Sequence, residues 1–266
     1  MDIPFFLIEV FNNPQLAMRG NIAAVLHLEE KMSDAKMQEI AEDLAQPATS
    51  FMIRSQNHPK IFDIRWFAPS SEIGLCGHGS LAAIASLQNE TVLDEKVVFN
   101  FPAGQIQSEL ISPSQASIVI EAVKITKRNY DFGELEAALG QKVLEHYFTE
   151  NKDIVILENE KAIRSLKPDF ESLRKLKSFG YSISSFGESV DYVSRTIIPF
   201  VPILEDQATG SSQATLAPYW AKQLNKNRLK THQLSERGGE FHIDIKENHV
   251  KLKGNYKILS QGLLSI

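Results

Sequence analysis

An apolar stretch that follows a glycine-bracketed histidine constrains the fold of this chain more than any other segment. It reads G-L-C-G-H-G-S-L-A-A-I over residues 74–84. Its periodicity predicts a helix over residues 79–88 that is apolar on nearly every side. A helix without a polar face must be enclosed by other elements. The sequence therefore predicts short strands curled about one buried helix.

The same stretch predicts an anion-binding site. A helix that opens on Gly77, His78 and Gly79 offers unpaired backbone N–H groups and the positive end of its dipole to a negative ligand. A similar motif, E-D-Q-A-T-G-S-S-Q-A-T-L, returns over residues 205–216. A gapless alignment of the two motifs pairs Glu72 with Glu205, Cys76 with Thr209, Gly77 with Gly210, His78 with Ser211 and Gly79 with Ser212.

The segments around both motifs follow one order. Each half runs through a strand, an Arg…Pro segment (65–69 and 195–199), an acidic loop, a glycine-led apolar helix and further strands. This order predicts an internal repeat, with chance similarity between two Gly/Ser-rich turns as the alternative. We expect an α+β fold of two pseudo-symmetric lobes, residues 1–122 and 123–255, with a C-terminal strand at about 256–266 that crosses back to the first lobe.

Further elements are predicted from local patterns. Strands are expected over 3–11, 97–101, 106–110, 116–122, 153–157, 181–186, 191–199, 232–234, 240–245 and 250–254. Ser33 is expected to cap a helix that stops near Gln46 and Pro47. Other helices are expected over 131–139, before Gly140, and over 170–177.

Composition excludes several classes of function. The formal net charge of −5, with scattered Lys and Arg, argues against nucleic acid or an anionic membrane as the main partner. One cysteine excludes an internal disulfide and a Cys-rich metal site, and the seven histidines show no metal-binding spacing. The chain has no apolar run long enough for a bilayer, and its start lacks a basic region. We therefore expect a cytoplasmic protein without a metal.

The repeat suggests a chemistry. Two similar lobes, each with a helix start directed at the interface, would enclose one small acid between two dipole ends. Side chains on opposite faces of that acid could remove a proton on one side and return it on the other. Such an arrangement suits an isomerisation next to a carboxylate.

The whole chain resembles the phenazine-biosynthesis PhzF-like isomerase/epimerase family, whose fold is that of diaminopimelate epimerase. The matching segments run from end to end in family order: 4–11, 20–25, 37–44, 64–82, 153–158, 191–195, 205–212, 216–220 and 233–240. The resemblance implies two lobes of curled mixed sheet around central helices and an active site in the cleft between them. It also implies a small carboxylate substrate, no cofactor, no metal and, commonly, a homodimer.

The resemblance assigns roles to individual residues. It places the catalytic groups at His78, Asp206 and Ser211, and a Gly-Asn turn of the site at Asn21. His78 can carry a proton near neutral pH, and Asp206 can orient or exchange one. Ser211 and nearby N–H groups can bind a carboxylate or an enolate-like charge. The remaining substrate-binding candidates are Gly77, Gly79, Thr209, Gly210, Ser212 and Gln213.

The chain departs from the family pattern at one important position. The catalytic glutamate of the family falls on Ala48, in I-A-E-D-L-A-Q-P-A-T-S-F. A lapsed family member that only binds a small anionic metabolite is therefore an alternative to an active isomerase. A third possibility is an enzyme in which Cys76 acts as one base, with Thr209 at the partner position. The alternative for Cys76 is a purely structural role.

Other noted residues have structural interpretations. Glu72 and Glu205 are expected to cap or brace their loops, and Trp66 and Trp220 to belong to the core. Arg237 is assigned to a turn before a strand, with a substrate carboxylate or a dimer interface as its alternatives.

Overall fold

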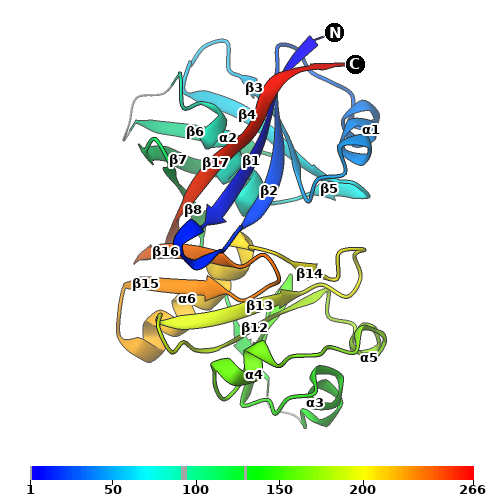
Figure 1. The fold of residues 1–266 in the computed structure, drawn as a ribbon, viewed down its shortest axis with the longest axis vertical. Coiled ribbons are helices and arrows are strands. Elements are labelled where there is room, and N and C mark those ends of the chain that lie inside the picture. Colours follow the sequence, from blue (N-terminus) through cyan, green and yellow to red (C-terminus); the bar gives the residue numbers. More distant parts are fainter. Residues whose placement is uncertain (1, 91–94, 129–130) are drawn as a thin grey trace. The chain divides into compact units, whose positions relative to one another are not determined.

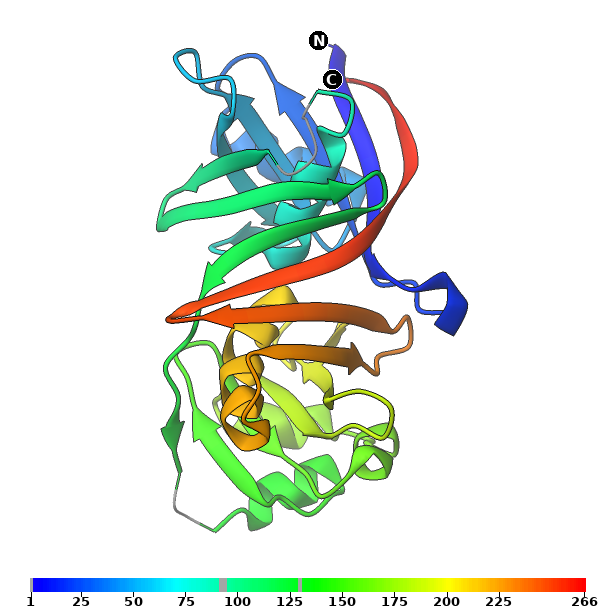
Figure 2. The ribbon, with the colours of Figure 1, turned by 90° about the vertical axis from the view of Figure 1, so that its left-hand side faces the viewer.

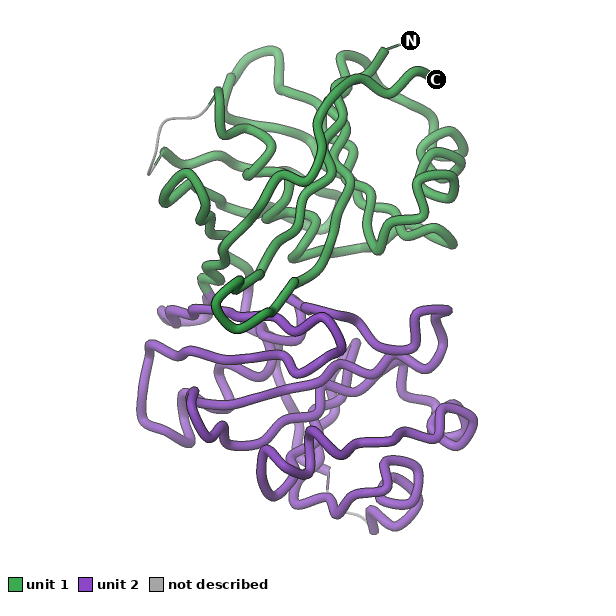
Figure 3. The backbone as a smooth tube through the Cα atoms, in the orientation of Figure 1, with its two compact units in different colours: residues 1–120, 251–266 green, residues 121–250 purple. Residues whose placement is uncertain are grey.

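The computed structural model describes residues 2–90, 95–128 and 131–266. Two compact units divide the chain (Figure 3): unit 1 comprises residues 1–120 and 251–266, and unit 2 residues 121–250. Each unit is a mixed sheet with its own central helix (Figure 1). The predicted α+β class is confirmed.

Unit 1 is a ring of paired strands around α2. Its elements are β1 (Asp2–Asn12), η1 (Pro14–Leu16), β2 (Asn21–Leu28), α1 (Asp34–Leu44), β3 (Thr49–Arg54), β4 (Ile61–Ala68), β5 (Ser71–Ile73), α2 (Gly77–Ser86), β6 (Lys96–Phe101), β7 (Gly104–Ser112), β8 (Gln115–Glu121) and most of β17 (His249–Ser265). The pairings run β17–β1–β2–β3–β4–β6–β7–β8, and β8 returns to β17. The pairs β2–β3 and β4–β6 are parallel, which requires a crossover in each case.

In the described residues of unit 1, two α-helices form the two crossovers. α1 joins β2 to β3, and α2 joins β4 to β6. Every residue of α2 is buried, and the strands enclose the helix (Figure 2). Ser33 caps α1 as predicted, and the helix ends at Leu44 because Ala45 adopts a left-handed C-cap.

The helix α2 begins at Gly77, as the glycine-bracketed histidine motif predicted, and two residues before the start at residue 79 that periodicity predicted. Periodicity located the first apolar side chain, whereas the backbone turns helical directly after Cys76. Sγ of Cys76 accepts a hydrogen bond from N of Gly79 (3.3 Å), so a cysteine serves as the N-cap.

Unit 2 repeats this arrangement. Its elements are β9 (Thr126–Lys127), α3 (Gly133–Leu139), β10 (Glu145–Phe148), β11 (Lys152–Ile156), α4 (Glu160–Arg164), α5 (Phe170–Lys175), β12 (Gly180–Phe186), β13 (Tyr192–Ile197), β14 (Glu205–Asp206), α6 (Gly210–Leu224), β15 (Arg228–Gln233) and β16 (Gly239–Lys246). The pairings run β9–β10–β11–β12–β13–β15–β16. The pairs β11–β12 and β13–β15 are parallel, and α6 is the crossover of the second pair.

The strand registers of the two units correspond residue by residue. Arg65 of β4 lies opposite Phe51, and Arg195 of β13 lies opposite Ile183. Each arginine forms a two-pronged ion pair with the glutamate of the following short strand: Nε to Oε1 is 2.7 Å in both Arg65–Glu72 and Arg195–Glu205. The two glutamates thus brace the loops that lead into α2 and α6.

The space under the two central helices is filled differently. In unit 1 a Cβ added at Gly79 would lie 2.7 Å from Cδ1 of Trp66 and 2.9 Å from Oγ of Ser50. In unit 2 the corresponding helix residue is Ser212, and Oγ of Ser212 lies 2.9 Å from Oγ of Ser182 and 3.0 Å from Oγ1 of Thr196. The indole of Trp66 fills this space beside Gly79 in unit 1, whereas three small hydroxyl side chains fill it in unit 2.

Candidate functional site

The start of α2 gathers the predicted residues of unit 1. His78 is the second residue of the helix and is only 7% exposed. Its Nδ1 lies 3.5 Å from Sγ of Cys76. Oγ of Ser50, on β3, donates to the carbonyl of Gly79 (3.1 Å) and ties the helix start to the sheet. The imidazole is therefore held among fixed groups at the positive end of a helix.

Asn21, the other predicted residue of unit 1, is the first residue of β2 and is buried. Its Oδ1 accepts a hydrogen bond from N of Ile22 (3.0 Å). The preceding Gly20 has φ +58°, and a Cβ there would lie 1.9 Å from the carbonyl oxygen of Val10. Only glycine fits this close approach, which explains Gly20 of the Gly-Asn pair in physical terms.

The start of α6 gathers the predicted residues of unit 2. Thr209 occupies the N-cap position of α6, but its side chain makes no capping hydrogen bond. Instead, Oγ1 of Thr209 donates to Oδ2 of Asp206 (2.8 Å). The first N–H groups of α6 are thus left without a side-chain cap from Thr209, beside a carboxylate that Thr209 orients.

Three consecutive residues of α6 occupy different environments. Ser211 is half-buried, whereas Ser212 and Gln213 are wholly buried. Ser212 bonds to the sheet as described above, and Oε1 of Gln213 accepts from the hydroxyl of Tyr192 (2.6 Å). A tyrosine hydroxyl is already protonated at neutral pH, and burial raises the pKa of Tyr192 still further above its usual value. Ser212 and Gln213 hold the helix from inside, and Ser211 is the more accessible of the three.

One residue of this network was missed by the sequence analysis. Gln233, at the end of β15, is wholly buried. Its Oε1 accepts from N of Thr209 (2.8 Å), and its Nε2 donates to the carbonyl of Asp206 (2.5 Å) and to Oγ1 of Thr209 (3.1 Å). Because Gln233 supplies the donor to Oγ1, the proton of the Thr209 hydroxyl is directed at Asp206. In the sequence, the only signal was the position of Gln233 within a family-like segment.

Ala48 precedes β3 and is wholly buried. Its carbonyl accepts from N of Ala24 (2.9 Å), which continues the ladder of β2 and β3. Alternation along an extended strand places its side chain on the same face as that of Ser50, which contacts Gly79 at the start of α2. The position that lacks the family glutamate thus lies on the α2 face of the strand.

Three comparisons with known proteins bear on these motifs. The model of the phenazine biosynthesis-like protein family, PhzC-PhzF, matches residues 8–262. The chain belongs to this family. An uncharacterized isomerase of Pseudomonas aeruginosa is 30% identical over 285 residues, with full coverage of both chains. A crystal structure of a PhzF family protein from Enterococcus faecalis has a TM-score of 0.90 and 32% identity, again with full coverage of both chains.

A more distant structural relative is similar to this PhzF family member in fold only. A hydroxyproline epimerase from Agrobacterium vitis, solved with bound trans-4-OH-L-proline, has a TM-score of 0.66 at 11% identity and covers 99% of this chain and 91% of its own. The predicted resemblance to the PhzF-like family and to an epimerase fold is therefore confirmed.

Two further observations concern metal ions and membranes. Among the described residues, no group of three or more His, Cys, Asp and Glu side chains is placed to hold a metal ion. No helix within residues 2–90, 95–128 and 131–266 is long and apolar enough to cross a bilayer.

Proposed function

We propose that this PhzF family member is an isomerase or epimerase that acts on a small carboxylate by acid/base proton transfer. The observation that carries the proposal is the Thr209–Asp206 hydrogen bond of 2.8 Å. It turns a helix-capping hydroxyl toward a carboxylate, and so leaves the α6 start without its side-chain cap. The 206–212 segment then contains both an oriented proton carrier and a helix start that can bind an anion.

The proposal gives each predicted residue a role. His78 and Asp206 exchange protons with the substrate carbon, and Ser211 with the N–H groups of residues 210–212 binds the carboxylate. In unit 1, Gly77, Gly79 and Asn21 form the substrate-binding backbone around His78. Thr209, Ser212 and Gln213 support the α6 start from within unit 2. The proposal is also supported by the names of curated relatives, which include several isomerases.

The experiment that tests this function begins with a thermal-shift screen of small carboxylates. A binding ligand raises the melting temperature by mass action. Hits are then incubated with the protein in heavy water, and deuterium incorporation next to the carboxylate is measured by NMR. We expect incorporation with the wild type, and at least about a hundredfold slower incorporation with Asp206→Asn or His78→Gln.

Two results would contradict the proposed roles. Deuterium incorporation that survives both substitutions would remove His78 and Asp206 from the mechanism. A ligand that shifts the melting temperature without any exchange would favour the second candidate function.

That second candidate is a binding protein without catalysis, and the buried alanine at position 48 favours it. Ala48→Glu distinguishes the two. In an active enzyme that works without the family glutamate, the added carboxylate leaves exchange unchanged or slower. In a lapsed member, it starts exchange that the wild type lacks.

Two broader expectations remain proposals. We propose that the protein forms a homodimer. The expectation of a cytoplasmic location stays a prediction from the sequence, and fractionation of cells that express the protein checks it.

A further inference from the structure

Unit 1 contains a pocket beside the start of α1, with a volume of about 440 Å³. Phe51 of its lining follows Ser50, whose hydroxyl donates to the carbonyl of Gly79 in α2, so strand alternation places the Phe51 ring on the sheet face opposite α2. The apolar side chains of this unit 1 pocket belong to, or pack against, one hydrophobic cluster: Leu28, Met32, Met37, Phe51 and Ile53. The pocket thus offers an apolar surface to a ligand.

Strand register places a carboxylate in the same row as these apolar groups. Leu28 pairs with Ile53, and Ile53 pairs with Asp63. Asp63 in turn pairs with Asn100 of β6. Side chains paired across neighbouring strands lie on the same face of a sheet. The row therefore runs from apolar groups on β2 and β3 to a carboxylate on β4.

The arginine of the lining is already bound by two carboxylates. Nε and Nη2 of Arg65 lie 2.7 and 2.8 Å from the two carboxylate oxygens of Glu72. Nη1 of Arg65 lies 2.5 Å from Oδ1 of Asp34. One cation between two anions leaves this group with an excess of one negative charge, so Arg65 does not favour an anionic ligand.

Asp63 is the carboxylate that a ligand can reach. It is exposed, and its Oδ1 accepts from Nδ2 of Asn100 (3.2 Å). Among residues 2–90, 95–128 and 131–266, no cationic side chain pairs with Asp63. The remaining lining charge is Lys31, which is exposed in the segment after β2. Neighbouring strands lie about 4.8 Å apart, so Asp63 on β4 is roughly 10 Å from the line of β2.

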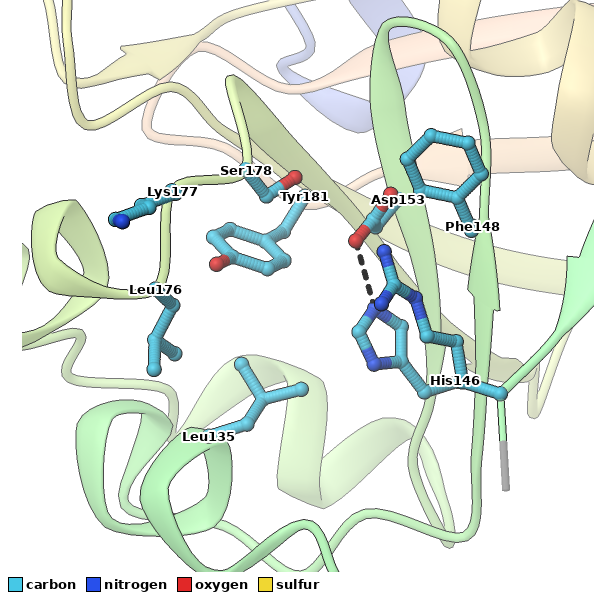
Figure 4. A pocket seen from close by; sticks show the side chains of 9 residues that line it. Leu135, His146, Phe148, Asp153, Leu176, Lys177, Ser178 and Tyr181 are labelled. Atoms are coloured by element: carbon cyan, nitrogen blue, oxygen red, sulfur yellow. Dashed lines mark hydrogen bonds and ion pairs between the residues drawn. The ribbon is translucent and has the colours of Figure 1, made fainter. Parts of the chain in front are cut away.

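A second pocket, in unit 2, shows the contrasting case of a carboxylate held by the protein (Figure 4). Asp153 of this pocket is 3% exposed, and its Oδ2 lies 2.9 Å from Nε2 of His146. Its Oδ1 accepts from N of Thr149 (3.2 Å). Both oxygens of Asp153 thus have protein partners, whereas Asp63 is exposed and bound by a single neutral amide.

Charge and lining together indicate the class of ligand. Among the charged groups of the unit 1 pocket and the Glu72 that binds Arg65, two are positive and three are negative. This excess of negative charge favours a cation. We propose that the unit 1 pocket binds a small primary amine with an apolar body. The ammonium group donates to Asp63, and the apolar body lies against Ile53 and Phe51.

The volume sets the size of this amine. About 440 Å³ corresponds to roughly fifteen water molecules at their liquid density. An amine of about ten non-hydrogen atoms fits into this space.

The site goes beyond the proposed isomerase function. It contains none of His78, Asp206 and Ser211, and its lining residues lie within 28–102 of unit 1. Amine binding therefore stands or fails separately from proton exchange at the other motifs.

The test uses 2-phenylethylamine as the probe and 2-phenylethanol as its neutral analogue. Each is titrated into the full chain labelled with ¹³C-methyl methionine. Met32 and Met37 line the pocket, whereas Met18 and Met52 do not. The bound phenyl ring should shift the methyl signals of the first two and leave those of the other two in place. The amine is expected to bind at about millimolar concentration, and the alcohol at least about tenfold more weakly.

Variants assign the charge contact. Asp63→Asn is expected to weaken the amine about tenfold, because it removes the charge and keeps the shape of the side chain. Asp43→Asn, at an exposed position of α1 outside the pocket, is the matched control with the same change in net charge, and it should leave the affinity unchanged. Lys31→Gln should not weaken the amine, because it removes a like charge.

Four outcomes would overturn the inference. The first two are the absence of amine binding and equal binding of 2-phenylethanol. The third is tighter binding of 3-phenylpropionate than of the amine, which would assign the pocket to an anion at Lys31. The fourth is an equal effect of Asp43→Asn and Asp63→Asn, which would reflect net charge alone.

Discussion

The amide of Gln233 fixes the direction of the hydrogen bonds in the 206–209 loop. One end accepts from N of Thr209, and the other donates to Thr209 and Asp206. Because the Thr209 hydroxyl accepts a hydrogen bond from Gln233, it must donate its own proton to another group. The acceptor is the Asp206 carboxylate, at 2.8 Å. The orientation of the proposed proton carrier thus depends on a residue that does not touch the substrate in our proposal.

Two substitutions separate these contacts. Gln233→Leu removes all three bonds in a buried setting, and we expect the free energy of unfolding to fall by about 2–3 kcal/mol. Gln233→Glu keeps an acceptor for N of Thr209 but loses both donors, so the Thr209 hydroxyl is drawn away from Asp206. Urea denaturation measures the stability, and deuterium exchange measures the effect on the site.

The control for these variants is Gln261→Glu, because Gln261 is exposed on β17. It should change stability by less than about 0.5 kcal/mol. If Gln233→Leu proves as mild as this control, the loop does not depend on Gln233.

The packing of α2 against β4 is tight enough to allow only glycine at position 79. The added Cβ of Gly79→Ala would meet Trp66 at 2.7 Å. We expect a loss of about 1–3 kcal/mol from overpacking, measured by urea denaturation. Trp66→Phe should relieve part of this loss, because the smaller ring leaves room. The indole N–H has no hydrogen-bond partner among the described residues, so phenylalanine loses none.

The double variant gives the decisive comparison. If the helix and the ring compete for the same space, Gly79→Ala and Trp66→Phe together should be at least about 0.5 kcal/mol more stable than the sum of the single effects implies. Strict additivity would show that another contact limits position 79.

The junction of β2 with the end of α2 makes unit 1 sensitive to acid. Nε2 of His27 lies 2.8 Å from Oγ of Ser86. Burial lowers the pKa of His27 below its usual 6.5, Arg54 lowers it further, and Glu90 opposes the shift. The folded protein therefore favours the neutral ring, whereas the unfolded chain takes up a proton near pH 6.5.

This shift predicts the pH dependence of stability. The contribution of His27 is fully present above pH 6.5 and is lost as the pH falls toward the lowered pKa of the folded state. The slope from this one group is at most about 1.4 kcal/mol per pH unit. Denaturant titrations at pH 7.5 and pH 5 give the difference in free energy of unfolding between these two values. His27→Gln should remove the contribution of His27 from this difference. His249→Gln, at an exposed position, should not; equal profiles for both variants would contradict the assignment.

The sequence predicted elements with strong local signals and missed those without them. The cap at Ser33 and the buried helix after His78 follow from residue types and periodicity, and Trp66 and Trp220 are in the core as predicted, each 1% exposed. The sequence predicted two strands, over residues 250–254 and about 256–266, where the structure has the single long strand β17 (His249–Ser265). Its pairing with β1, from Asp2↔Ser265 onward, is a contact between the two ends of the chain.

The candidate site shows the same division. His78, Asp206 and Ser211 could be named because they lie in short motifs. Gln233 could not, because its role arises from the register that places β15 beside β13, with Gln233 opposite Ser194. Nothing in the local sequence of a glutamine indicates such a register.

One set of exposed apolar side chains on this protein points to self-association. Leu259, Leu263 and Ile266, on and just after β17, are 42%, 66% and 37% exposed. Exposed apolar side chains along a strand are a recurrent feature of symmetric dimer interfaces, in which one surface meets its own copy. We propose that this end of β17 is the homodimer interface.

The dimer prediction is tested by sedimentation equilibrium at micromolar concentration. The wild type is expected to sediment as a dimer, and Leu263→Lys to weaken association by at least about tenfold, because a charge would be buried against its own symmetry mate. Leu144→Lys is the matched control, since Leu144 is 47% exposed but lies in unit 2. A monomeric wild type would refute the dimer, and a dimer that only Leu144→Lys disrupts would move the interface away from β17.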